Sequence, residues 1–113
     1  MLVVLPALFA IVILAVQGAF VYHAHTLAIA AAEEGARTAG ALHSTAGQGV
    51  TAATDFIAGV GGDKVLTGVQ VRAERTETAA RITVTGSSAS LIPGWDPRVQ
   101  AAASAPVERV TSP

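Results

Sequence analysis

The side chains of this sequence that could take part in acid–base chemistry are few and scattered. The candidates are His43, Asp55, Asp63 and Asp96, and no catalytic motif joins them. The chain has no nucleophile elbow, and its glycine-rich run at residues 59–62 lacks the lysine and the preceding strand of a phosphate-binding loop. We therefore expect no catalytic site and no cofactor, and the protein is not predicted to be an enzyme.

Two histidines, His23 and His25, come nearest to a metal-ligand pattern. Residues two apart point to different sides of a helix, so the two imidazoles would chelate a metal poorly. They follow Tyr22 at the end of a long apolar run, where amphipathic rings favour the headgroup region of a bilayer. We interpret them as an interfacial pair, and we expect no metal site. The absence of cysteine also excludes disulfides and thiolate ligands.

The distribution of charge divides the chain into two parts suited to different solvents. Hydrophobic residues make up 51% of the sequence and charged residues 13%, whereas charged residues are about a quarter of an ordinary soluble domain. No Asp, Glu, Lys or Arg precedes Glu33. The net charge of −1, without clustered Lys and Arg, gives no reason to expect a nucleic-acid partner.

One apolar run, LVVLPALFAIVILAVQGAFV, extends from Leu2 to Val21, and its single strongly polar residue is Gln17. A helix of that length is about 30 Å long, the thickness of the hydrocarbon core of a bilayer. Its large apolar side chains favour insertion by about 4–8 kcal/mol. Pro6 lies in the first turns, where its missing N–H is tolerated. We predict a transmembrane helix over residues 1–22, with the lipid bilayer as its partner.

A cleavable signal peptide is the alternative interpretation of this run. Its apolar region should be about 7–15 residues long, with positive charge before it and small residues after it. Residues 28–30, Ala-Ile-Ala, supply the small residues. The run is too long, however, and no Lys or Arg precedes it, so an uncleaved anchor is the preferred interpretation.

Helical patterning continues beyond the apolar run, so we expect one helix of about forty residues whose extracytoplasmic part lies within 23–45. Small residues recur on one face at spacings of three and four, namely Leu27, Ala31, Ala32, Gly35, Ala39 and Leu42. Such a face lets helix backbones approach closely and suits packing in a bundle or filament. The other side carries Glu33, Glu34 and Arg37, and Glu33 and Arg37 have the spacing of an ion pair.

Residues 46–113 are predicted to form a small exposed domain. After turn formers at 43–49 we expect a short helix from Val50 to Val60, which would cover the apolar face of a sheet. A hairpin follows, with alternating residues at 69–74 and 81–85, and a third strand at about 99–110 contains Pro106, which marks it as an edge. The fold class is α+β, with a small three-stranded antiparallel sheet.

Three features of the first forty residues occur in a specific order. Val4-Leu5-Pro6 opens the apolar run, Gln17-Gly18 lies within it, and YHAHTLAIAAAEEGAR follows it from Tyr22 to Arg37. In this order they resemble the TadE-like family of minor pilins, or pseudopilins, of tight-adherence (Tad, type IVc) pilus systems. The turn at 92–94, Ile-Pro-Gly, is similar in style to short actinobacterial members but is much less specific.

The resemblance implies a structural role rather than catalysis. It implies a pilin-like subunit of a Tad-type pilus or of its assembly machinery, anchored in the cytoplasmic membrane with its C-terminal domain outside, or at the cell surface after assembly. Its partners would be other pilins or pseudopilins and the pilus assembly platform. The alternative is a membrane-tethered or secreted envelope-binding domain unrelated to pili.

Two groups of residues are candidates for this role. The assembly helix would use Pro6, Gln17, Gly18, Leu27, Ala31, Gly35, Ala39 and Leu42. The candidates for partner contacts are Glu33, Glu34, Arg37 and Trp95. For the first three, the preferred interpretation is a solvated helix face. For Trp95, it is a ring that plugs the core of the sheet.

Two of these positions carry sharper expectations. Gln17 could hydrogen-bond to a neighbouring helix, with an average gain of about 0.6 kcal/mol in membranes, or it could bond within its own helix or reach the interface. Replacing Gly35 with leucine is predicted to weaken assembly while membrane insertion persists.

The resemblance further implies a prepilin peptidase as a partner. Just upstream of the start of this hydrophobic run, members of the family usually have a glycine for cleavage, and they have a glutamate a few residues into the mature protein. Neither residue stands at those places in this sequence.

Overall fold

The computed structural model describes residues 2–41, 43–92 and 94–107. The helices are α1 (Val4–Gly40), α2 (Ala46–Gly59) and the 3₁₀ helix η1 (Gly62–Lys64). They precede three strands, β1 (Leu66–Arg75), β2 (Ala79–Ser88) and β3 (Arg98–Pro106). The predicted α+β fold, with a long N-terminal helix, a short helix and a small antiparallel sheet, is confirmed.

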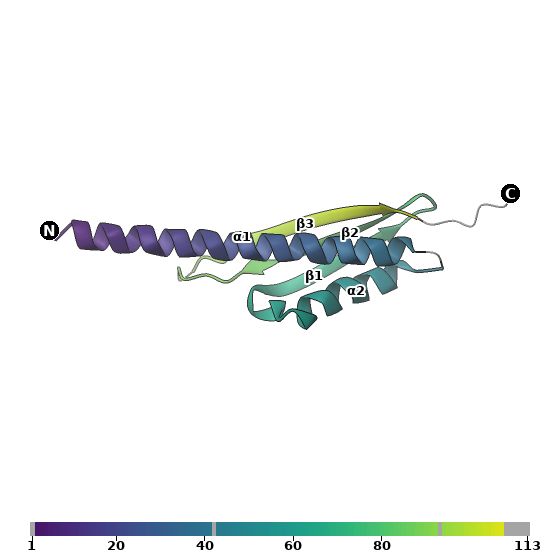
Figure 1. The fold of residues 1–113 in the computed structure, drawn as a ribbon, viewed down its shortest axis with the longest axis horizontal. Coiled ribbons are helices and arrows are strands. Elements are labelled where there is room, and N and C mark those ends of the chain that lie inside the picture. Colours follow the sequence, from purple (N-terminus) through teal and green to yellow (C-terminus); the bar gives the residue numbers. More distant parts are fainter. Residues whose placement is uncertain (1, 42, 93, 108–113) are drawn as a thin grey trace.

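The molecule is 77 Å long and 20 Å across, and α1 gives it that length (Figure 1). The N-terminal part of α1 extends beyond the remaining elements, and its C-terminal part lies among them. The expected continuous helix is confirmed, although it ends at Gly40. The next residue, Ala41, is extended, with φ −66° and ψ 157°.

The second helix begins earlier than the predicted Val50. It starts at Ala46 because Thr45 and Gln48 form a capping box. The Thr45 hydroxyl accepts a hydrogen bond from the Gln48 amide at 3.2 Å, and the Gln48 side chain accepts one from the Thr45 amide at 2.9 Å. These reciprocal bonds outweigh the turn preference of the two glycines in the first turn.

The three strands lie in the order β1-β2-β3, and both neighbouring pairs are antiparallel. The predicted hairpin is confirmed, with a turn at 76–78 in which the Thr76 amide donates to the Ala79 carbonyl at 2.8 Å. A register shift between Thr67 and Gln70 uses Gly68, whose φ is +60°. β3 is an edge strand, as Pro106 indicated, and it ends at that proline; residues 108–110 of the predicted strand lie outside the described residues.

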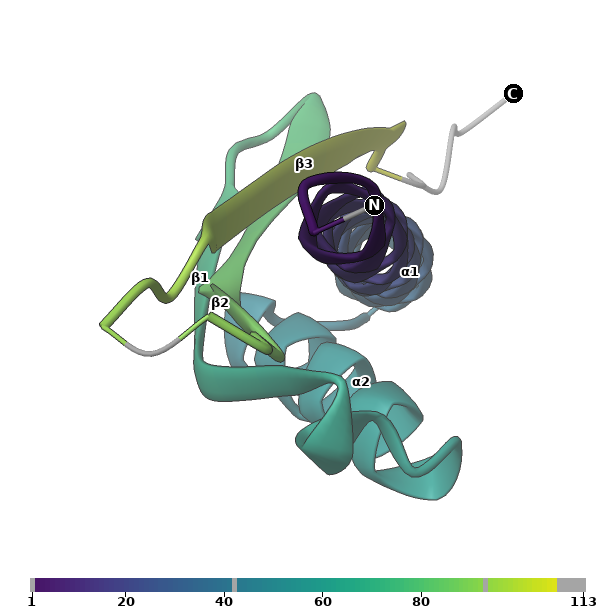
Figure 2. The same cartoon turned by 90° about the vertical axis from the view of Figure 1, so that its left-hand side faces the viewer.

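The apolar face of the sheet is covered mainly by α1, so the prediction that the second helix covers it is wrong. α1 lies over β2 and β3, whereas α2 packs beside α1 and reaches the sheet mainly at β1 (Figure 2). The reason is the alanine-rich side of α1, which lets the helix lie close to the strands. Ile82 and Val84 of β2, both fully buried, fill the space beneath it.

Candidate assembly helix

The N-terminal half of α1 exposes nearly all its large apolar side chains. Phe9 is 66% exposed and Leu14 is 59% exposed. Pro6 is also exposed, in the first turns of the helix. In length and composition α1 could cross a membrane, and it is the one such helix among the described residues. The transfer of such side chains from water to an apolar environment lowers the free energy, so this half is more stable in an apolar environment.

Burial begins at Gln17, which is 2% exposed. Its Nε2 donates to the Ala89 carbonyl at 3.1 Å, and its Oε1 accepts from the Leu91 amide at 2.8 Å. Both partners belong to the loop between β2 and β3, more than seventy positions along the chain. The bond within its own helix, one of the expected alternatives, is not formed, because both ends of the side-chain amide bond to this loop. It joins α1 to the loop through both halves of its amide.

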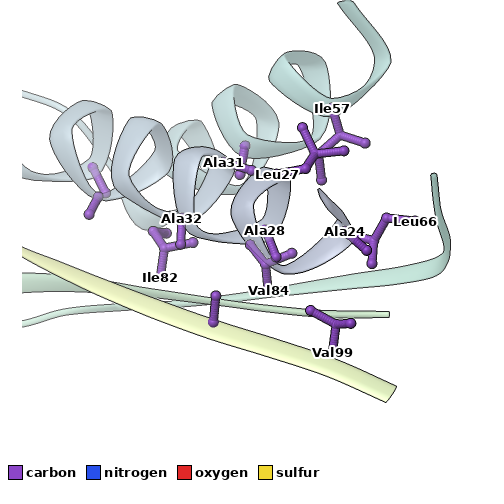
Figure 3. Close-up of a cluster of buried hydrophobic side chains, with 14 of the residues drawn as sticks. Ala24, Leu27, Ala28, Ala31, Ala32, Ile57, Leu66, Ile82, Val84 and Val99 are labelled. Atoms are coloured by element: carbon purple, nitrogen blue, oxygen red, sulfur yellow. The ribbon is translucent and has the colours of Figure 1, made fainter. Parts of the chain in front are cut away.

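The small-residue face of α1 is enclosed within the chain itself. Leu27 is 8% exposed, and Ala31, Ala32 and Ala39 are fully buried. Figure 3 shows Leu27 and Ala31 facing α2, with Ala28 and Ala32 above Ile82 and Val84 of the sheet. The predicted close helix packing therefore occurs between α1 and α2 of one molecule. Leu42, the last predicted residue of this face, lies outside the described residues.

Gly35 is one of the tight points of this packing. A Cβ atom there would lie 2.8 Å from the Gly49 carbonyl oxygen and 3.1 Å from side-chain atoms of Ala53 and Ile82. Gly49 is equally constrained, since a Cβ on it would lie 2.6 Å from Ala39 Cβ. The two glycines let α1 and α2 approach each other over the sheet. Sequence reasoning treated Gly49 as a turn former, although a glycine in a helical segment also indicates close backbone packing.

The outward side of α1 carries the charged residues. Glu33 and Arg37 are exposed and Glu34 is partly exposed. The ion pair is Arg37–Glu34, at 3.0 Å between Nη1 and Oε2, and not the expected Glu33–Arg37 pair. Residues three apart are neighbours on a helix as well as residues four apart, so the spacing alone left the choice open. Gly18 is also exposed, with no described atom within 4 Å of a Cβ built on it.

A contact that sequence reasoning missed joins the far end of α1 to the sheet. Arg75 Nε, at the end of β1, donates to the Ala39 carbonyl at 2.8 Å. Carbonyls in the last turn of a helix lack an intrahelical partner, and a cation is favourable there. No local sequence signal pairs two residues 36 positions apart.

Trp95 was expected to plug the core of the sheet, but it does not. It is 47% exposed and lies in the loop between β2 and β3, where its amide donates to the Ile92 carbonyl at 3.2 Å. The core beneath α1 is already filled by aliphatic side chains from the strands, such as Val84 and Val99. The indole is therefore left at the surface.

The candidate acid–base residues do not come together. His43 lies in the turn before α2, Asp55 on the exposed side of α2, and Asp96 in the loop before β3. The side chain of Asp63 lies outside the described part of the structure. Within that part, no three His, Asp or Glu side chains are grouped so as to hold a metal ion.

The family described as TadE-like protein matches residues 1–37. The first 37 residues are thus similar to this family. The match confirms the resemblance read from the first forty residues, and the TadE-like segment ends within α1, three residues before Gly40. No curated protein and no solved structure matches the chain.

Proposed function

We propose that this TadE-like chain is a minor pilin or pseudopilin-like structural subunit of a Tad-type pilus or of its assembly machinery. The apolar half of α1 anchors it in the cytoplasmic membrane, and the α+β domain lies outside. One observation carries the proposal: the TadE-like segment coincides with α1, a helix that is exposed and apolar in one half and is the spine of the domain in the other.

The burial along α1 favours an uncleaved anchor over a signal peptide. Cleavage after residues 28–30 would remove Ala24, Leu27 and Ala28, which belong to the buried core. It would also remove Gln17, which holds the loop between β2 and β3. Losing buried side chains from a domain of this size costs several kcal/mol of stability. A domain built on this helix is therefore expected to keep it.

The surfaces proposed for assembly are those that the chain leaves uncovered. The apolar half of α1 is one, and it includes Pro6. The other is the outward stripe of the same helix, which consists of exposed residues at spacings of four or seven, namely Gly18, Tyr22, Ile29, Glu33 and Arg37. Other pilins or pseudopilins and the assembly platform would contact these surfaces. The small-residue face from Leu27 to Ala39 would act indirectly, by holding the domain on the helix.

The test is mass spectrometry of the mature N-terminus in the native host, on separate membrane and sheared-surface fractions. Membrane retention with α1 intact, together with material in the sheared fraction, supports the proposal. A cut just after a glycine upstream of the apolar run would add the prepilin peptidase as a partner. A mature N-terminus near Ala31 would overturn the proposal, because the helix would then be a discarded signal peptide.

A further inference from the structure

The exposed large apolar side chains of the domain gather at one end. Outside residues 2–16, the described residues of this kind are Tyr22, Ile29, Val60, Leu91 and Trp95. Val60 lines the same shallow cavity as His23 on α1, and Leu91 is bonded to Gln17. All but Ile29, which lies near the middle of the enclosed part of α1, therefore lie on the side of the domain from which the apolar half of α1 emerges.

The opposite end is polar in the described residues. Its turns contain Ser44 and Thr45 on one side and Thr76, Glu77 and Thr78 on the other. No exposed large apolar side chain lies there within the described part of the chain. The domain thus has a polarity along α1, with apolar surface toward the predicted span and polar surface away from it. Scattered apolar residues would not produce such a gradient.

The Gln17 contact sets the depth of the loop between β2 and β3. Gln17 lies four residues before the end of the apolar run, or about 6 Å along the helix axis. A loop bonded to it must lie level with the last turn of that run. Figure 1 shows the loop between β2 and β3 reaching along α1 toward its N-terminal part. Irregular backbone is costly at that depth unless its polar groups are paired. The glutamine pairs the Ala89 carbonyl and the Leu91 amide.

We propose that Leu91 and Trp95 bind the boundary between headgroups and acyl chains of the bilayer that α1 enters. Leu91 is 50% exposed and Trp95 is 47% exposed, on a loop that the Gln17 contact holds at this level. Tryptophan favours the membrane interface, where its ring is in apolar surroundings and its N–H remains hydrated. Asp96 and Arg98, both exposed, remain among the headgroups and limit the depth. The inference rests on the proposed function only in that α1 is a membrane anchor.

Trp95 is the sole tryptophan of the chain, so its fluorescence tests the proposal directly. The full chain is reconstituted at low density in phosphatidylcholine–phosphatidylglycerol vesicles, some containing lipids brominated near the headgroup end of the acyl chains. We expect emission at short wavelength, severalfold stronger quenching by brominated lipid than in a distal control, and weak quenching by aqueous acrylamide. The distal control is Trp95→Phe with Ala79→Trp, at an exposed position beside the far hairpin turn.

Gln17→Leu is the matched variant for the contact. It should keep the anchor, release the loop and bring quenching of Trp95 by brominated lipid down to that of the distal control. Strong acrylamide quenching of Trp95 in the unaltered protein would overturn the inference. Shielding from acrylamide without quenching by brominated lipid would also overturn it, because a protein neighbour would then cover the loop. Flotation separates this failure from that of the proposed function, since a chain that does not float with the vesicles has no anchor.

Discussion

The two halves of α1 are both apolar, yet they behave in opposite ways. The N-terminal half, residues 4–16, is rich in Leu, Ile, Val and Phe, and Leu8 is 59% exposed. The C-terminal half, residues 17–40, is rich in alanine and glycine, and Ala31 is fully buried, with 0% of its surface exposed. The more hydrophobic half is thus the less buried. A core buried for hydrophobicity alone would show the reverse order.

The difference shows that two kinds of apolar surface serve two environments. Large side chains give the N-terminal half the transfer free energy that favours a bilayer. Small side chains in the C-terminal half contribute little transfer free energy each, but they allow the backbones of α1 and α2 and the sheet to come close, so that dispersion contacts accumulate. Substitutions that exchange these properties should separate anchoring from folding.

The largest effect is expected from Gly35→Leu. Its side chain would collide with the Gly49 carbonyl and with Ala53 and Ile82, so α2 must move away. Overpacking of this kind costs about 3 kcal/mol. This replaces the expectation that the variant would lose assembly alone, because loss of assembly would follow from loss of the domain. Thermal unfolding of the detergent-solubilised chain, followed by circular dichroism, measures the effect.

Gly18→Leu is the control for that substitution. It adds the same side chain to the same helix at an exposed glycine, and we expect almost no change in the unfolding midpoint. Both variants should fractionate with membranes. If Gly35→Leu unfolds at the temperature of the unaltered protein, the close approach of α1 and α2 described above is incorrect.

Gln17→Leu should have the next largest effect, at the boundary between the halves. It leaves the Leu91 amide without its partner and removes one of two donors to the Ala89 carbonyl, the other being the Ser88 hydroxyl at 3.2 Å, at a cost of about 2 kcal/mol. It also removes the only strongly polar side chain from the apolar run at residues 2–21, so membrane retention should persist. Hydrogen exchange of the Leu91 amide should accelerate on the order of tenfold or more, as follows from that cost. The Trp95 amide, bonded within the loop, is an internal reference, and equal rates at Leu91 in both proteins would contradict the expectation.

The boundary also shows what the sequence could predict. Periodicity and turn chemistry are local, and they predicted the long helix, the hairpin and the edge strand. The partner of Gln17 is 72–74 positions away, and nothing near Ala89 or Leu91 indicates it. The small-residue face was recognised correctly as a packing surface. Its partner was not, because an alanine face suits a helix of the same chain as well as one of another subunit.

Arg75→Ala tests the far end of the C-terminal half. Removing the guanidinium leaves the Ala39 carbonyl without its donor in the last turn of α1, at a cost of about 1 kcal/mol. Hydrogen exchange should show fraying confined to that turn, while the contact at Gln17 stays protected. Arg75→Lys keeps the charge near the helix end but not the planar donor. If the lysine variant restores full protection, then charge, and not the hydrogen bond, stabilises this end.

The smallest effect on stability is expected on the outward side of α1. Arg37 and Glu34 form an ion pair whose side chains are 73% and 39% exposed, so Arg37→Ala should change the unfolding free energy by about 0.5 kcal/mol or less. This small effect is useful, because any larger consequence must come from a contact outside the chain.

If the outward stripe binds other subunits, Arg37→Ala and Glu33→Gln should reduce the amount of protein in the sheared-surface fraction while leaving its level in the membrane unchanged. Unaltered surface fractions with both variants would count against the stripe and leave the apolar half of α1 as the proposed assembly surface.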